Sequence, residues 1–415
     1  PSLDEMASVA KEMERRGLEL PLLIGGATTS RQHTAVKIAP HYSQPVIHVL
    51  DASRSVNVVS DLLSEGRKEA FADANREEQT KLRAVYEGRK EKPLVPIADA
   101  RANAARLEFS EKTTSRPAFL GRRVVDDVTA ADLEPYIDWT FFFSAWDLKG
   151  KYPKILDDPT VGAAARDLFE NGRALLDEII EKKWLEPRGV YGFWPARRDE
   201  DDIVLYADED LAHEVARFPM LRQQSVQADG KPNRSLADFV APGDAGVPDY
   251  VGAFAVTSGG QAEDLAARFE KDHDDYRAIM VKALADRLAE AFAELLHARA
   301  RADWGYGADE SLSNVELIAE KYRGIRPAFG YPACPDHLPK RTLFELLDAP
   351  DIGMELTETC SMMPAASVSG LYFGHPDARY FTIGRLGRDQ IEDYADRLDI
   401  TVEDAERWLA SNLGY

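Results

Sequence analysis

The first 65 residues alternate between helical stripes of apolar side chains and short apolar runs. Ser2 caps a predicted helix in which apolar or small residues recur every three or four positions, and Gly17 ends it. The runs 21–24 and 45–50 predict two short buried strands, each followed by a predicted helix. Because strands that alternate with helices form parallel sheets, residues 1–65 predict the end of a parallel α/β domain.

Charged side chains dominate the next part of the chain, residues 66–119. The segment 66–92 is rich in Lys, Arg and Glu and has a helix-forming composition, which Pro93 and Pro96 then interrupt. We interpret it as a solvated helix that leads into an extended linker around 93–113. No motif in this part indicates chemistry, so it predicts a connector between two folded parts.

Residues 120–415 form the largest predicted domain, in which helix and strand patterns are segregated. Apolar stripes predict long helices over 161–183 and 262–301. Runs rich in β-branched and aromatic residues predict strands at 189–195, 203–206, 250–257, 366–373 and 379–383. The last two are expected to form a hairpin. Because the strands do not alternate with helices, the pattern predicts an α+β domain with a twisted antiparallel sheet.

Length, charge and cysteine content narrow the class of protein. The 415 residues carry 51 basic and 72 acidic side chains, and the difference, a net charge of −21, argues against nucleic acid as the main partner. No apolar run approaches the roughly 18 residues of a membrane span, and the N-terminus has no signal-peptide pattern. Two cysteines without a C-x-x-C motif predict neither a disulfide framework nor structural zinc, and they indicate a reducing cytoplasm. Since the chain starts at Pro1, directly before a helix, we expect it to be a fragment.

Candidate chemistry is concentrated in the stretch 326–337, with the sequence RPAFGYPACPDH. Three prolines and a glycine exclude a helix, so a rigid loop is expected to present Arg326, Tyr331, Cys334 and His337. A guanidinium in such a loop suits a carboxylate, which it can hold through two hydrogen bonds. Two interpretations stay open: Arg326 binds the carboxylate of a ligand, or it pairs with a neighbouring acid in a structural turn.

Further candidate residues also have simple structural explanations. Asp138 lies within the aromatic cluster 136–143, where a carboxylate needs a partner or serves as a helix N-cap. Glu290 falls off the apolar stripe of its helix and shares a face with Glu294, so the pattern alone indicates two solvated acids. Tyr380 and Phe381 alternate faces of a predicted strand, so one is expected in the core and the other beside a ligand.

The carboxyl ends of the two N-terminal strands are a second candidate site. Gly25 and Gly26 follow the first strand, and Ala52 lies just beyond the second. Ligands of parallel α/β sheets bind at such ends. A bare Gly-Gly is a weak signal, however, because a tight turn without a ligand is its default interpretation.

The loop motif R-x-x-x-G-Y followed by P-A-C-P-x-H resembles a known family. It is similar to the S-adenosylmethionine-binding loop of the reactivation domain of cobalamin-dependent methionine synthase. The resemblance continues through 136–140 (YIDWT), 187–190 (PRGV), 236–242 (LADFVAP), 252–257 (GAFAVT), 366–370 (ASVSG) and 408–409 (WL). It therefore covers essentially the whole chain, and residues 1–65 resemble the C-terminal part of a Rossmann-like cobalamin-binding domain.

The resemblance implies two sets of site residues. For S-adenosylmethionine, Asp138 would face the α-amino group, Glu290 would help to hold the cationic methionine end, and the remaining contacts would come from Arg326, Tyr331, Tyr380 and Phe381. For cobalamin, Gly25, Gly26 and Ala52 would lie near the nucleotide tail. The Asp-x-His-x-x-Gly loop that supplies the family's axial histidine does not occur in the 415 residues, so only part of a cobalamin site is expected.

The implied function is reductive reactivation of cobalamin within the methyl transfer that makes methionine from homocysteine. One electron, from a flavodoxin-type donor, would reduce the oxidised cofactor while S-adenosylmethionine methylates it to methylcobalamin. The expected partners are that donor and the cobalamin-binding and substrate modules of the full-length enzyme, with no nucleic acid and no membrane. The alternative is a non-catalytic module that senses S-adenosylmethionine. A small-molecule methyltransferase is disfavoured, because no strand–Gly-x-Gly–helix loop precedes the main domain.

Overall fold

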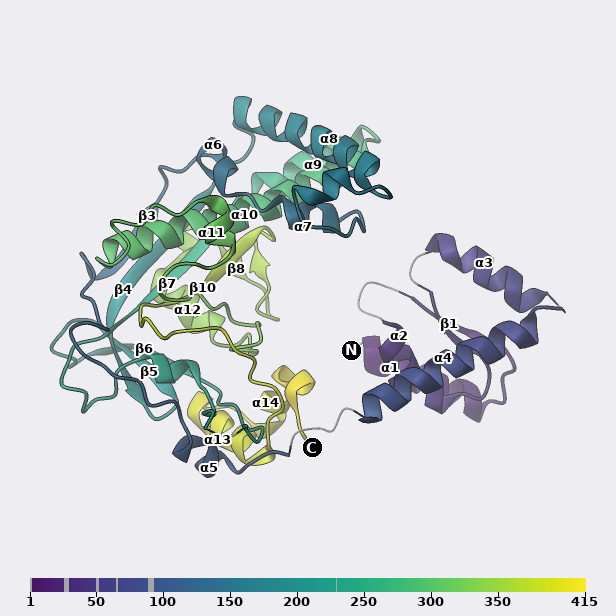
Figure 1. The fold of residues 1–415 in the computed structure, drawn as a ribbon, viewed down its shortest axis with the longest axis horizontal. Helices are drawn as coiled ribbons and strands as arrows, with labels where there is room; N and C mark the ends of the chain where they lie inside the picture. The colour runs from purple at the N-terminus through teal and green to yellow at the C-terminus, as the bar shows by residue number, and fades with distance from the viewer. Residues whose placement is uncertain (1, 26–29, 50–51, 65, 89–92, 229) are drawn as a thin grey trace. The chain divides into compact units, whose positions relative to one another are not determined.

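A computed structural model describes residues 2–25, 30–49, 52–64, 66–88, 93–228 and 230–415 of the chain (Figure 1). The chain divides into two compact units, Pro1–Lys92 and Pro93–Tyr415. This boundary differs from the predicted connector 66–119. The charged helix α4 (Lys68–Gly88) packs within the first unit, where Asn75 and Gln79 donate side-chain hydrogen bonds to the carbonyl of Val46.

The first unit has the predicted order of helices and strands. Strands β1 (Leu22–Ile24) and β2 (Val46–His48) pair in parallel. Helix α1 (Ser2–Arg15) ends at Gly17, whose φ of +65° suits glycine. The other helical segments are α2 (Arg31–His33), a π-helical turn at Thr34–Ile38, a 3₁₀ turn at Ala39–His41 and α3 (Ala52–Leu63). Buried Ala10, Ile24, Ile38, Tyr42 and Val46 form its main core.

An antiparallel sheet organises the second unit. Among the described residues its strand order is β10-β7-β4-β5-β6, and β3 pairs with β4. The strands are β3 (Gly121–Val125), β4 (Arg188–Asp199), β5 (Asp202–Tyr206), β6 (Glu214–Pro219), β7 (Tyr250–Thr257) and β10 (Ser367–Phe373). This arrangement confirms the predicted antiparallel α+β class.

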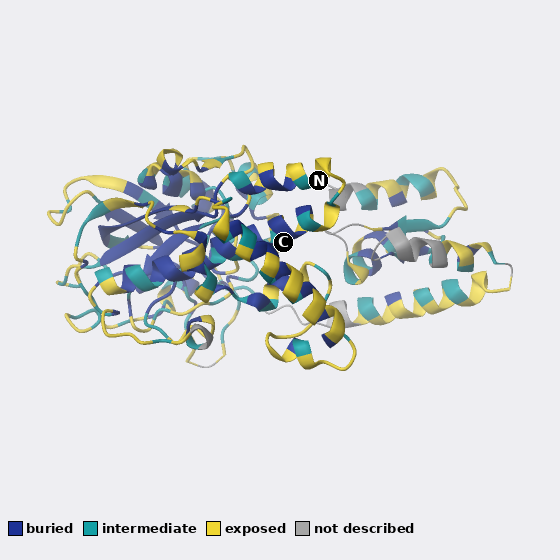
Figure 2. Cartoon of the chain, turned by 90° about the horizontal axis from the view of Figure 1, so that it is seen from above, coloured by how far each residue is buried: buried dark blue, intermediate teal, exposed yellow. Residues whose placement is uncertain are grey.

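Helices cover both faces of the sheet, which explains why β7 is buried along its whole length (Figures 1 and 2). Phe254 and Val256 share a core with α10 (Asp275–Asp303), whereas Val251, Ala253 and Ala255 share a second core with α12 (Lys340–Leu347). Alternate residues of one strand thus enter different cores. The other helices are α5 (Ile97–Ala102), α6 (Ala130–Leu133), α7 (Trp139–Ser144), α8 (Gly162–Glu181), α9 (Gln261–Lys271), α11 (Asn314–Ile318), α13 (Arg388–Leu398) and α14 (Val402–Trp408). A small strand pair joins β8 (Glu355–Leu356) and β9 (Met362–Met363).

Two predicted elements of this unit are wrong. The helix expected over 262–301 is two helices, α9 and α10, because His273 adopts a left-handed conformation (φ +61°) and the Asp274 side chain caps α10. The hairpin expected between 366–373 and 379–383 does not form. Residues 379–383 are not a strand, and β10 pairs with β7 instead.

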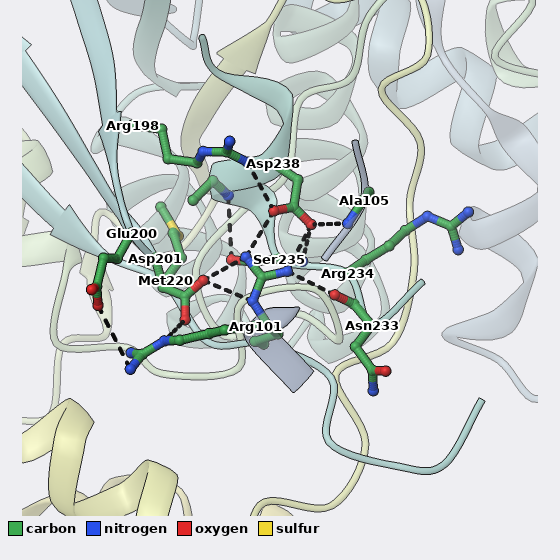
Figure 3. Close-up of polar contacts among 12 residues, drawn as sticks. Arg101, Ala105, Arg198, Glu200, Asp201, Met220, Asn233, Arg234, Ser235 and Asp238 are labelled. Carbon is green, nitrogen blue, oxygen red and sulfur yellow. Dashed lines mark hydrogen bonds and ion pairs between the residues drawn. The ribbon is translucent and has the colours of Figure 1, made fainter. Parts of the chain in front are cut away.

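A buried network of charged side chains holds α5, which lies within the expected extended linker 93–113, to the turn between β4 and β5 (Figure 3). Arg222 donates hydrogen bonds from Nε to Asp201 Oδ1 (2.8 Å) and from Nη2 to Asp238 Oδ1 (2.7 Å). Arg101 of α5 donates from Nε to Asp201 Oδ2 (2.8 Å) and from Nη2 to Asp393 (2.7 Å) on α13. Arg222, Asp201 and Asp238 are each at most 2% exposed. This network therefore ties α5, the β4–β5 turn and α13 together.

Within the described residues, every helix is too short or too polar to cross a membrane.

Candidate ligand-binding site

Two adjoining hollows of about 500 and 550 Å³ lie beside the loop that follows Arg326. They share Glu290, Glu320, Arg326 and Tyr331 in their linings. All six residues predicted for S-adenosylmethionine line one hollow or both: Asp138, Glu290, Arg326, Tyr331, Tyr380 and Phe381. These residues come from the N-cap of α7, from α10 and from two loops, so the fold brings together side chains that are up to 243 positions apart (381 − 138).

The loop is held against the edge strand β10. Ile325 exchanges backbone hydrogen bonds with Phe373, and Leu371 N donates to the carbonyl of Pro327 (3.1 Å). A tight turn follows, in which Gly330 N donates to Cys334 O (2.8 Å). The pairing fixes the direction of the chain at Arg326, so the backbone presents this side chain to the hollow.

Gly330 is required by this turn, and Gly330→Ala is expected to destabilise the second unit by about 2–4 kcal/mol. Its φ is +93°, and an added Cβ would overlap the ring of His337, whose Nδ1 lies 2.9 Å from Lys340 Nζ. Gly353→Ala is the matched control, since φ there is +78° but a Cβ would meet no atom within 4 Å. Denaturant unfolding of both variants separates the cost of a left-handed alanine, which both share, from the cost of the clash, which only Gly330→Ala has. Equal losses of stability would contradict the predicted clash.

Arg326 is paired with an acid from α10. Its Nη2 donates to Glu294 Oε2 at 2.9 Å, while Glu290 Oε2 lies 4.0 Å from Nη1. Burial lowers the pKa of the guanidinium, but the charge of Glu294 and smaller contributions from Glu290 and two neighbouring tyrosines together outweigh this effect, so the pKa lies above its ordinary value. The interpretation of Glu290 and Glu294 as two solvated acids is therefore wrong for Glu294, which is 7% exposed.

Acids outnumber bases around the second hollow. Asp138, Glu290, Glu294 and Glu320 face only Arg287 and Arg326 in its lining. Asp138 is the N-cap of α7, where its Oδ1 accepts a hydrogen bond from Thr140 N (2.8 Å). The structural explanation and the ligand contact are compatible, because a capped carboxylate still carries a negative charge into the hollow. The site thus combines the loop guanidinium of Arg326, for an anion, with an excess of negative charge for cations.

Aromatic side chains form part of the wall and rim. The Tyr380 hydroxyl accepts a hydrogen bond from Arg326 N (3.0 Å). Tyr331 and Tyr380 are 61% and 39% exposed, whereas Phe381 packs partly into two hydrophobic cores. Both Tyr380 and Phe381 line the first hollow. Phe381 is closer to the core than Tyr380, but because residues 379–383 are not a strand, the expected division into one core residue and one ligand-facing residue is wrong.

Cys334 and His337, the other polar groups of the loop, support its shape. Cys334 Sγ donates to Ala328 O (3.0 Å), and burial raises the pKa of this thiol. Burial, with the nearby charge of Lys340, lowers the pKa of His337. A protonated thiol and a neutral imidazole are poor partners for a charged ligand, which leaves Arg326 as the cation of the loop.

A family comparison agrees with these observations. The profile described as vitamin B12 dependent methionine synthase, activation domain, matches residues 129–399. The chain belongs to this family. It is also similar to a solved structure described as "Crystal Structure of the MetH Reactivation Domain bound to AdoHcy", with 51% sequence identity and a TM-score of 0.76. The similarity covers 78% of this chain and 99% of that one. The predicted resemblance to a methionine synthase reactivation fragment is thereby confirmed.

Sequence reasoning missed several residues of this activation-domain site. Glu320 and Tyr322 precede the predicted loop, and Phe141 lies three residues after Asp138. For Glu294, the sequence pattern predicts a solvated acid and not a residue of the site. Its spacing of four residues from Glu290 places both acids on one helix face, which was the available signal.

The N-terminal candidates are only partly described by the structure. Gly25 directly follows β1, and a Cβ added there would lie 3.3 Å from Val49 O, just after β2. Ala52 begins α3, and Gly26 lies outside the described residues. The carboxyl ends of β1 and β2 are therefore adjacent, as expected for a parallel sheet, and cobalamin binding there stays a prediction.

Proposed function

We propose that the second unit binds S-adenosylmethionine in the two adjoining hollows and presents it for reactivation of methionine synthase. The observation that carries this proposal is the pairing of a single loop guanidinium, Arg326, with an acid-rich wall in an activation-domain fold. The solved structure of the similar reactivation domain has AdoHcy bound. AdoHcy differs from the proposed ligand by the absence of the methyl group that is transferred.

The chemistry of the ligand matches that of the lining. The carboxylate of S-adenosylmethionine would bind Arg326, and its ammonium and sulfonium groups would lie near Asp138 and Glu290. Tyr331, Tyr380 and Phe381 offer rings and hydroxyls to the adenosyl part or to the sulfonium. No described side chain of the lining is an activated nucleophile, so we assign these residues to orientation of the ligand.

The nucleophile would come from another module. Cobalamin, when bound to its own domain, supplies the cobalt that accepts the methyl group. In this chain Gly25, Gly26 and Ala52 would contact that cofactor, as the family resemblance implies. The rim of the hollows carries exposed apolar side chains, Phe141, Ile318, Tyr331 and Tyr380, and such a rim suits a docking protein module. A flavodoxin-type protein is the proposed electron donor.

Titration calorimetry of S-adenosylmethionine and S-adenosylhomocysteine into the full chain tests the binding proposal. Saturable one-site binding is expected for both ligands. Methyl transfer from radiolabelled S-adenosylmethionine to added cobalamin, in the presence of a reductant, then separates reactivation from mere sensing. Binding without any cobalamin-dependent transfer would favour the sensor, and the absence of binding at millimolar ligand would overturn the proposed function.

Tyr380→Phe is expected to weaken S-adenosylmethionine binding by about 1 kcal/mol, or roughly fivefold in Kd. The substitution removes the acceptor for Arg326 N and leaves that amide without its partner. Tyr331→Phe is the matched control, because the Tyr331 hydroxyl makes no hydrogen bond in the described structure. Titration calorimetry on both variants measures the difference between their losses of S-adenosylmethionine affinity. A larger loss for Tyr331→Phe would mean that its hydroxyl, rather than that of Tyr380, serves the ligand.

A further inference from the structure

Arg326 contacts the two acids on its side of α10 unequally. The Glu294 side chain is 9% exposed and lies 2.9 Å from Nη2, whereas that of Glu290 is 41% exposed and lies 4.0 Å from Nη1. A short contact between two largely desolvated charges is much stronger than a longer contact in water. Glu294 is therefore the acid that holds the guanidinium in the ligand-free protein, and Glu290 is the more exposed of the two acids in the lining.

Other cations near Glu294 are already committed. Along α10, Glu294, His297 and Arg301 follow one another on a buried face. His297 stacks on Tyr372 (5.0 Å, interplanar angle 5°), and burial lowers the pKa of His297 well below its ordinary value, so this imidazole is neutral. Arg301 has its own acid, since its Nε donates to Glu310 Oε2 at 2.8 Å. Arg326 is thus the cation that compensates Glu294.

The pair is incomplete by itself. In the part of the chain that the structure describes, Glu294 Oε1 and Arg326 Nε are buried and have no hydrogen-bond partner. One contact, from Nη2, fixes the plane of a guanidinium whose own backbone amide is bonded to Tyr380. Because the guanidinium is rigid and planar, fixing Nη2 also determines where Nη1 points.

We propose that Glu294 is a positioning residue, which holds Nη2 of Arg326 so that the Nη1 side is presented to the carboxylate of the ligand. This inference rests on the proposed function, because it concerns the same hollow. Glu294 touches Arg326 and not the reacting groups. Its removal should therefore affect recognition of the amino-acid end of the ligand and leave recognition of the adenosyl end unchanged.

Two probes separate these ends: S-adenosylhomocysteine, and 5′-methylthioadenosine, which lacks the amino and carboxyl groups. Glu294→Met keeps the length of the side chain and removes the acceptor. It is expected to weaken S-adenosylhomocysteine binding about tenfold, with 5′-methylthioadenosine changed less than about twofold. Glu294→Gln, whose amide oxygen still accepts a hydrogen bond, should restore part of the loss. Glu310→Met, which removes the acid partner of Arg301 in the same way, should change neither affinity.

A double-mutant cycle that combines Glu294→Met with Arg326→Ala completes the test. In that background Glu294→Met should have no further effect on S-adenosylhomocysteine, because the residue acts through Arg326. Equal weakening of both probes would identify a general structural role and overturn the inference. Tighter S-adenosylhomocysteine binding would also overturn it, since Glu294 would then compete with the ligand for Arg326. If the wild-type chain binds neither probe, the proposed function fails before this inference is reached.

Discussion

Replacement of Arg326 by alanine is expected to weaken S-adenosylmethionine binding by about 2–3 kcal/mol, which is roughly 30- to 150-fold in Kd. The variant loses a charge-assisted contact to the carboxylate of the ligand. It also leaves Glu294, which is 7% exposed, without the cation that lies 2.9 Å away. Calorimetric titration, with circular dichroism to verify folding, measures the loss.

Arg287→Ala is the matched control for this prediction. Arg287 lines the same hollow, and its guanidinium lies over the ring of Phe141 at 5.5 Å from the centroid. Both substitutions remove one positive charge, so a purely electrostatic effect would be similar in the two variants. We expect less than about 0.5 kcal/mol for Arg287→Ala. Arg326→Lys retains the charge but not the planar guanidinium, so its loss of binding free energy should lie between those of Arg326→Ala and Arg287→Ala. An unchanged affinity in folded Arg326→Ala would remove the loop from the site.

The sequence allowed prediction of those elements whose local pattern agrees with their surroundings. The strand pattern at 250–257 and the apolar stripe at 161–183 correspond to β7 and α8. The break between α9 and α10 carries no proline or glycine, because Asp272, His273 and Asp274 make the turn through a left-handed histidine. Residues 379–383 alternate like a strand, yet Ile383 N donates to Pro332 O instead of to a neighbouring strand. At 379–383 a tertiary contact therefore decides the local structure, whereas the α9–α10 break is made by residues that sequence patterns do not mark as helix breakers.

The site was predictable as a set of side chains, but its internal contacts were not. The six predicted S-adenosylmethionine residues lie around one pair of hollows. Both open interpretations of Arg326 describe part of the structure, since it pairs with an acid and also borders the hollow. The identity of that acid depends on how deeply each turn of α10 is buried against β10, and such burial is a property of packing that residue spacing does not contain. The same limit applies to residues 93–113: their sequence predicts a linker, whereas the buried contacts of Arg101 come from packing.

A second large loss of stability is expected away from the hollows, at Arg222. Arg222→Met should destabilise the second unit by about 3 kcal/mol at pH 7, because it leaves two buried carboxylates with fewer partners. Asp201 would retain Arg101, at 2.8 Å, and Asp238 would retain Arg198, at 3.2 Å. Arg217→Met is the matched control. Arg217 bonds three acids, Asp199, Asp202 and Glu214, against two for Arg222, but its side chain is 34% exposed, so less than about 1 kcal/mol is expected.

The pH dependence of this loss distinguishes an uncompensated buried charge from a packing defect. Burial raises the pKa of the Asp201 carboxyl, but Arg222 and Arg101 outweigh this effect, and the pKa lies below its ordinary value. In the wild-type protein this contribution to stability is therefore complete above about pH 4, the unfolded-state pKa, and is lost only as the pH falls further. In Arg222→Met the carboxyl loses most of its compensation and should take up a proton at a higher pH. The difference in unfolding free energy between wild type and variant should then shrink from pH 7 towards pH 4, as measured by urea denaturation. A difference that stays constant over this range would mean that Arg222 contributes through its packing, and not through its charge.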